Sequence, residues 1–237
     1  RFLMGSPPDE ADRRNNEGPQ REVDIRYPFA VGRASVTFAE WDAAVAAGAN
    51  LPVPADKGWG RGARPVIKVS WEDAKAYLTW LNERLGLGGR TDAWRLLSES
   101  EWEYSARAGT TTPFSFGATI SKSQANYGDE NSDFLSNLDS GQTTPVGTFA
   151  ANAFGLHDMH GNVSEWVEDC YENGYSDGQP ADGRPHLLGS CSLRVIRGGS
   201  WPDGPRSLRS ASRLAEQPVA RSFIIGFRVA RSLFSTP

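Results

Sequence analysis

Hydrophobic and polar positions follow a helical period at three places in the first half of the chain. In the clearest of them, Trp71, Ala74 and Leu78 recur at the i, i+3, i+7 spacing of one buried helix face. Each segment opens with a Ser or Thr that can cap the first free amides. The predicted helices are 38–47 after the capping box Thr37-x-x-Glu40, 71–85 after the N-cap Ser70, and a shorter one from the capping box Ser98-x-x-Glu101 to Gly109.

Short strands are expected around these helices. Val23, Ile25 and Tyr27 alternate with charged residues, and the segments 29–31 and 65–69 also have the composition of short strands. Residues 1 to 20 are predicted as a surface loop that follows a short strand. Beyond Gly109 the helical period disappears, and short apolar clusters are separated by Gly, Pro, Asn and Asp. The pattern therefore predicts a loop-rich α+β domain.

Composition narrows the possible partners. The chain has 237 residues, 38% of them hydrophobic, and is predicted to form a single domain over 1–237. Its 25 Lys and Arg against 29 Asp and Glu leave a net charge of −4, so we expect no nucleic-acid partner. No apolar run approaches the roughly 20 residues that cross a bilayer, so we expect a soluble chain. Because its start reads as part of a strand, a segment is expected to precede it, and the compartment, cytoplasmic or exported, is left open.

Two cysteines, Cys170 and Cys191, lie 21 positions apart on either side of a loop rich in Gly, Pro and Asp. One disulfide that staples this loop and a pair of buried free thiols are both compatible with that spacing. A third alternative, a relocated reactive thiol site, is less favoured because the loop offers no basic neighbour in sequence.

A series of short strings runs in order through nearly the whole chain. They are Phe2-Leu3-Met4-Gly5-Ser6, Pro65-Val66, Val69-Ser70-Trp71-Glu72-Asp73-Ala74, Trp94-Arg95-Leu96, Glu101-Trp102-Glu103-Tyr104, Ala108-Gly109-Thr110, Thr144-Pro145-Val146-Gly147, Asn152-Ala153-Phe154-Gly155-Leu156, Gly161-Asn162-Val163, Glu165-Trp166-Val167, Arg197-Gly198-Gly199-Ser200-Trp201, Arg209-Ser210-Ala211 and Gly226-Phe227-Arg228. Together they resemble the formylglycine-generating enzyme, or sulfatase-modifying factor, family. The resemblance implies an elaborated C-type-lectin-like fold with few helices and short antiparallel strands.

The same resemblance implies an activity that this sequence lacks the residues to perform. The family's oxidases bind copper through two cysteines that follow the Gly-Gly-Ser-aromatic string, and thiolates suit Cu(I). Here the segment 202–208 contains no cysteine. A second relative class uses iron and histidines, but the three histidines here show no ligand spacing. His157 and His160 are expected to be packed side chains, with a metal-ligand role as the less favoured alternative, and His186 is alone in a polar loop.

Calcium is the cofactor that the resemblance implies. Asp158 and Glu165 would supply side-chain oxygens, and Gly161 and Val163 backbone carbonyls, which are the hard ligands that calcium prefers. The alternative is that both carboxylates cap backbone or pair with arginines. A second site would use Asn126 and the carbonyl of Tyr127, with Asp139 as a further candidate.

The C-terminal segment is where a binding surface is expected. Exposed aromatic side chains on a rigid scaffold are typical of binding sites, and the position resembles the variable segment of diversity-generating-retroelement proteins. We therefore predict a non-oxidase, calcium-stabilised domain that binds a protein, a peptide or a small molecule. Two alternatives remain: Phe223 and Ile225 as core residues, and a metal-dependent oxidoreductase or oxygenase. The predicted ligand-binding residues are Trp201, Asp203, Arg206, Leu208, Ser222 and Phe223, and the arginines expected to be structural are Arg197, Arg209, Arg213 and Arg228.

Overall fold

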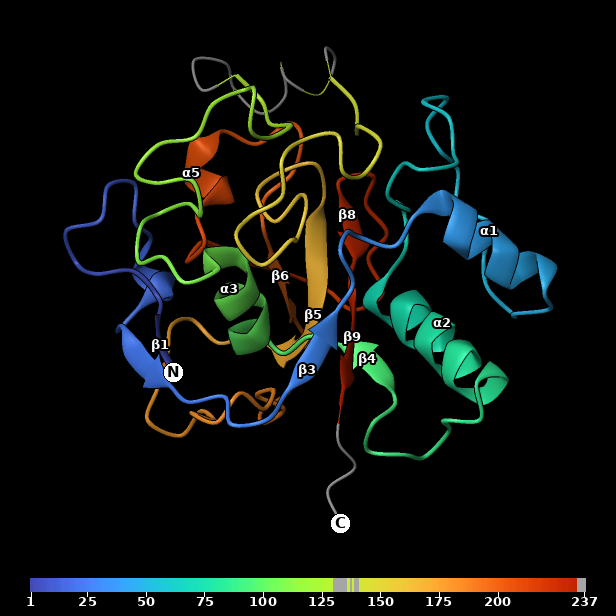
Figure 1. The fold of residues 1–237 in the computed structure, drawn as a ribbon, viewed down its shortest axis with the longest axis horizontal. Helices are drawn as coiled ribbons and strands as arrows, with labels where there is room; N and C mark the ends of the chain where they lie inside the picture. The colour runs from blue at the N-terminus through green and yellow to red at the C-terminus, as the bar shows by residue number, and fades with distance from the viewer. Residues whose placement is uncertain (130–135, 137, 139–140, 234–237) are drawn as a thin grey trace.

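Three small sheets and a few short helices are connected by long loops (Figure 1). The structure is a computed structural model and describes residues 1–129, 136, 138 and 141–233. Among these residues, all strand pairs are antiparallel except β5 with β8, which is parallel. The sheets are β1 (Phe2–Met4) with β2 (Arg21–Val23); β3 (Phe29–Val31), β9 (Val229–Ser232) and β4 (Trp94–Leu96); and β7 (Arg213–Glu216), β6 (Arg194–Arg197), β5 (Ser164–Cys170) and β8 (Ile225–Phe227).

The three predicted helices are confirmed, with ends that differ by one or two residues. Helices α1 and α2 lie together on one side of the central strands, and α3 lies on the other (Figure 1). Each begins with a reciprocal capping box, in which the N-cap hydroxyl accepts from the third amide and the acidic side chain accepts from the N-cap amide. The helices are α1 (Phe38–Ala46), α2 (Trp71–Arg84), α3 (Glu99–Arg107), α5 (Pro205–Leu208) and the 3-10 helix η1 (Asn15–Glu17). None of the helices within the described ranges has the length and apolar character needed to cross a bilayer.

Two strand predictions were wrong. The segment 65–69 forms no strand, because Lys68 has a φ of 56° and its amide bonds to the carbonyl of Ser222 instead of to a ladder. The strand that begins at Arg21 ends at Val23, since the next amide donates to Ala181, in a distant loop. Residues 1 to 20 are also more than a surface loop, because Glu17 is fully buried.

Two main hydrophobic cores are filled by tryptophan side chains. The larger core lies between α1, α2 and the strands, where Trp41 stacks on Tyr77 with ring centroids 5.5 Å apart. There Trp166 is fully buried and donates its indole N–H to the carbonyl of Val69 at 3.0 Å, which satisfies the polar atom inside the core. The second core lies under α3 around Trp102.

Buried ion pairs join distant segments of the chain. The four arginines expected to be structural are each at most 2% exposed, and each contacts a buried glutamate. Removing one partner of such a pair would leave the other charge buried without a counter-charge, which is strongly destabilising. These contacts therefore determine which segments can pack together. The pairs are Arg197 with Glu103, Arg209 with Glu17, Arg213 with Glu99, and Arg228 with Glu165.

Of the two main alternatives for the cysteines, the structure contains the disulfide. Cys170, at the end of β5, is bonded to Cys191, and their Cα atoms are 4.7 Å apart. The bond closes the loop that connects β5 to β6.

Candidate ligand-binding site

A tight turn after β6 positions the centre of the predicted site. Gly198 and Gly199 both have positive φ values, and a Cβ on Gly199 would lie 2.9 Å from the carbonyl oxygen of Ser207, so glycine is required there. The next residue, Ser200, donates from its amide at 2.9 Å and from its hydroxyl at 2.5 Å to Oδ2 of Asp203. These bonds fix Trp201 between the turn and α5.

Trp201 lies in an aromatic cluster that also contains Trp59 and Phe223. The ring centroids of Trp59 and Trp201 are 5.4 Å apart at 87°, and Phe223 lies 6.3 Å from each of them. Trp201 is 2% exposed, whereas Trp59 and Phe223 are half-buried. The exposed ammonium of Lys57 lies 4.6 Å above the ring of Phe223. The cluster therefore offers solvent an aromatic edge next to a cation.

Two of the other predicted residues, Arg206 and Leu208, have their contacts outside this cluster. Arg206 is exposed and donates to the carbonyl of Asp12 at 3.1 Å, on the N-terminal loop. Leu208 is fully buried in a small core with Phe114 and Ala125. The six residues therefore do not form one continuous surface, and the ligand-binding role of each stays a prediction.

Asp203 and Ser222 have roles in the backbone around the cluster. Burial raises the pKa of Asp203, although the bonds from Ser200 and the nearby charge of Arg14 oppose that effect. Ser222 accepts from the amide of Lys68 through its carbonyl at 2.8 Å, which anchors the segment before Phe223. Both residues therefore position the aromatic cluster.

Sequence reasoning missed Trp59 and Lys57, which lie in the segment treated only as a loop. Several residues of their loop adopt the left-handed backbone region, with φ values of 64° at Lys57 and 77° at Gly58. A signal was available, since a tryptophan between two glycines in a polar loop needs an apolar partner elsewhere in the chain. The sequence could not identify that partner.

The predicted calcium residues lie on the turn that leads into β5. Asp158 has a φ of 57° and accepts from the amide of Gly147 at 2.8 Å. Burial raises the pKa of Asp158, so its carboxylate would gain from a nearby cation.

Glu165 already has partners for both of its oxygens. Oε1 accepts from the hydroxyl of Ser35 at 2.6 Å, and Oε2 from the indole of Trp102 at 2.8 Å. Arg228 also lies 3.0 Å from Oε1. A calcium ion on this carboxylate would compete with a buried guanidinium, so Glu165 does not fit the ligand role and matches the alternative of pairing with an arginine.

The second predicted calcium site lies next to the first. The carbonyl of Asn126 accepts from the amide of Asn162 at 2.8 Å, and the Asn126 side chain donates to Gln142 at 2.9 Å. The carbonyl of Tyr127 accepts from the ammonium of Lys122. A cation of the chain itself thus lies on the oxygen expected to bind calcium. Asp139 lies outside the described residues.

The three histidines bond to different parts of the backbone and side chains. His160 is 3% exposed, bonds through Nδ1 to the carbonyl of Leu208 at 2.7 Å, and has its pKa lowered to about 4 by burial. His157 bonds to the carbonyl of Phe149 at 2.8 Å, and His186 lies 3.2 Å from Glu172. Across the described part of the chain, no three His, Cys, Asp or Glu side chains group as a metal site.

The chain is similar to a known protein family and to several named proteins. The family model described as sulfatase-modifying factor enzyme 1-like domain matches residues 1–233. A mouse protein named inactive C-alpha-formylglycine-generating enzyme 2 is 31% identical over 98% of this chain and 83% of its own length. Serine/threonine-protein kinases of three Chlamydia species also match, and this chain spans 25% of each.

Two solved structures share the fold. PvdO from Pseudomonas aeruginosa has a TM-score of 0.84 and 37% identity, over 98% of this chain and 91% of its own. Treponema denticola variable protein 1 has a TM-score of 0.78 and 25% identity, with the same coverage. The predicted fold, an elaborated C-type-lectin-like domain of the formylglycine-generating-enzyme type, is confirmed.

Proposed function

Because this chain belongs to the sulfatase-modifying factor enzyme 1-like domain family, we propose that it is a member that binds a ligand on the family scaffold without thiol-based oxidation. The fold, the glycine turn and the buried arginines are retained, whereas the copper-binding cysteine pair implied by the resemblance is absent from segment 202–208. A scaffold can keep its shape and change its chemistry, because the site and not the fold determines activity.

One observation carries the proposal: both cysteines of the chain are bonded to each other at the end of β5. Neither therefore lies in the segment after Trp201, where Asp203 instead fixes the turn through Ser200. The name of the mouse relative, an inactive enzyme that matches almost the whole chain, agrees with a role other than oxidation.

The aromatic cluster is the surface we assign to ligand binding. Trp59 and Phe223 are half-buried, so part of each ring is available, and the cluster rests on the rigid, buried Trp201. Lys57 adds a positive charge at the same edge. This combination suits a peptide or small molecule with an apolar or aromatic group beside an anionic one. The variable protein of Treponema denticola, which shares the fold, supports a binding role.

Calcium is the cofactor in this proposal, as a structural ion. The carboxylate of Glu165 is already paired with Arg228. The groups that would hold calcium are therefore the carboxylate of Asp158 and the backbone carbonyls of Gly161 and Val163. Its chemistry would be to neutralise Asp158 and to hold the turn before β5. One carboxylate with carbonyls makes a weak site, at the millimolar end of calcium affinities.

Two experiments test the proposal. The purified protein is incubated with Cu(I), oxygen and a peptide that carries the cysteine motif of sulfatases, and the peptide mass is followed; we expect no formylglycine. Formation of the aldehyde would overturn the non-oxidase role.

The second experiment selects peptides from a phage-displayed library on the wild-type protein. We expect that Phe223→Ala and Trp59→Ala lose most binding to the selected peptides, whereas Phe154→Ala retains it. Phe154 is a suitable control because it is 46% exposed and packs on Tyr104, away from the cluster. Equal binding by all three variants would contradict the assignment of this surface.

A further inference from the structure

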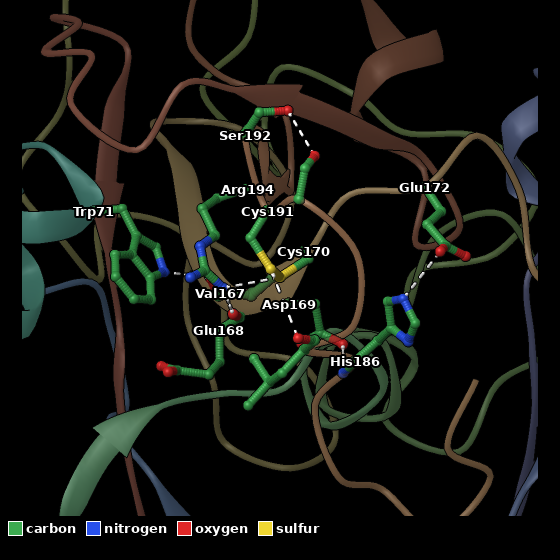
Figure 2. Close-up of a disulfide and its surroundings, with 12 residues drawn as sticks. Trp71, Val167, Glu168, Asp169, Cys170, Glu172, His186, Cys191, Ser192 and Arg194 are labelled. Atoms are coloured by element: carbon green, nitrogen blue, oxygen red, sulfur yellow. Dashed lines mark hydrogen bonds and ion pairs between the residues drawn. A yellow bond between two sulfur atoms is a disulfide. The ribbon is translucent and has the colours of Figure 1, made fainter. Parts of the chain in front are cut away.

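The two sulfur atoms of the disulfide lie in different surroundings (Figure 2). Cys170 is 3% exposed in β5, whereas Cys191 is half-buried in the loop beside the exposed residues Ser192 and Leu193. A guanidinium nitrogen of Arg194 donates to Sγ of Cys170 at 3.3 Å. We propose that this disulfide is a thiol-exchange site, in which an external thiolate attacks Cys191 and Cys170 leaves as a thiolate next to Arg194.

Arg194 is held firmly where the leaving thiolate would form. The same Nη1 donates to the carbonyl of Glu168 at 2.8 Å, and the guanidinium carbon lies 4.0 Å from the centre of the Trp71 ring. Trp71 is itself fixed by its indole N–H, which donates to the carbonyl of Val167 at 2.9 Å. Arg194 also faces Cys170 in the register of β5 and β6. A cation in this position stabilises a thiolate and makes Cys170 the better leaving group.

The two acidic residues that directly precede Cys170 in the chain have other partners. Glu168 forms an ion pair with Lys75 at 2.8 Å. Asp169 accepts from the amide of Glu99 at 2.7 Å. It also accepts from the amide of His186 at 2.8 Å (Figure 2). Glu168 is therefore paired with a lysine, the Asp169 carboxyl is bonded to two backbone amides, and Arg194 remains the ionic group bonded to the Cys170 sulfur.

The exchange is a balanced two-electron reduction by a dithiol. One thiolate of the reductant forms a bond to Sγ of Cys191 while the disulfide breaks, and the electron pair of that bond goes to Cys170. The second thiol of the reductant then displaces Cys191 from the mixed disulfide. The reductant leaves as a disulfide, and Cys170 and Cys191 are both left reduced.

Reduction would release a short, defined segment. His186 stays clamped, because its amide donates to Asp169 and its carbonyl accepts from the amide of Cys170 at 2.8 Å. Arg194 stays in β6. The residues between these two anchors include Leu187 and Leu188, which are 51% and 68% exposed. The segment 187–192 would therefore gain freedom, while β5 and β6, the two strands that flank it, keep their pairing.

The test uses the folded wild-type protein in glutathione buffers of increasing reduced-to-oxidised ratio, with free thiols trapped by alkylation and located by mass spectrometry. We expect reduction without denaturant, near-ultraviolet circular dichroism that keeps its native form, and the glutathione adduct on Cys191 with the alkylated thiol on Cys170. Resistance of the bond until urea is added, or an adduct on Cys170, would overturn the proposal.

Variants isolate the role of the cation. Arg194→Met should slow reduction by dithiothreitol several-fold, because the leaving thiolate loses its counter-charge, while Arg194→Lys should retain most of the rate. Arg184→Ala is the control, because Arg184 is a cation of the same loop but pairs with Asp182. Its rate of reduction by dithiothreitol should equal that of the wild type. Equal rates for the Met and Lys variants would count against the proposal. If Arg194→Met does not fold, the position of the adduct in the wild-type protein still decides the question.

Discussion

Arg228 and Glu165 form an ion pair in the centre of the molecule, with 3.0 Å between Nη2 and Oε1. Their side chains are 0% and 1% exposed. The pair joins the segment between β8 and β9 to β5, and Arg228 also donates to the carbonyls of Gly32 at 2.8 Å and His157 at 2.7 Å. One guanidinium thus connects segments that are far apart in the sequence.

Glu165→Gln should strongly destabilise the fold. The substitution keeps the shape of the side chain but leaves Arg228 buried without a counter-charge, which costs about 3–5 kcal/mol of unfolding free energy. Urea unfolding, monitored by circular dichroism, measures this loss of unfolding free energy. The same change at Glu168, on the same strand but paired with the partly exposed Lys75, should cost at most about 1 kcal/mol. Similar losses for the two variants would show that burial is not what makes the Arg228 pair important.

Stability should fall as the pH rises from about 4 to about 8, through Asp169. Burial, with the nearby charge of Glu99, raises the pKa of Asp169 to about 8. The folded state therefore holds a proton that the unfolded chain has already lost above its ordinary pKa of 3.8, and this stabilisation disappears as the pH approaches 8.

The measurement is the difference in unfolding free energy between the wild type and Asp169→Asn across this pH range. The variant has no titrating group at this position, so the difference should change steadily between pH 4 and 8. A constant difference would mean that the amides of Glu99 and His186, which favour the anion, outweigh burial.

The parts of the fold that the sequence predicts well are those determined by neighbouring residues. A capping box needs residues only three positions apart, and the boxes at Thr37 and Ser98 predicted the starts of α1 and α3 correctly. The segment 65–69 was predicted wrongly because its conformation depends on a bond between Lys68 and Ser222, which lie far apart in the chain.

The candidate site also depends on contacts between residues that lie far apart in the sequence. Composition could identify the arginines as structural, but not that Arg213 pairs with Glu99, 114 positions away. Trp201 and Phe223 could be chosen as neighbours from the resemblance, whereas Trp59 comes from a loop without a periodic pattern. Predicting it would require knowledge of which loop covers the turn after β6.

Trp59→Ala should expose Trp201. Trp59 covers the edge of that ring at 5.4 Å, and Trp201 is 2% exposed in its presence. Hydroxyl-radical footprinting with mass spectrometry should detect several-fold more oxidation of Trp201, with a loss of about 1–3 kcal/mol because the removed side chain is half-buried. Phe154→Ala, which removes an exposed aromatic ring elsewhere, should leave Trp201 protected. If Trp201 stays protected in the Trp59 variant as well, another residue must cover it.

Calcium should raise the unfolding temperature slightly, through Asp158. Because burial raises the pKa of Asp158, its carboxylate is destabilised as an anion and gains from a bound cation. A ligand at ten times its dissociation constant stabilises a protein by about 1.4 kcal/mol, which corresponds to an increase of a few degrees for a chain of this size. Melting curves in about 1 mM EDTA and in about 10 mM calcium, which is about ten times the highest dissociation constant of weak extracellular sites, measure this shift. Asp158→Asn should abolish it, whereas Glu168→Gln should retain it. Equal shifts with magnesium, or none with calcium, would remove calcium from the proposed function and leave Arg228 and Lys122 as the cations of these two turns.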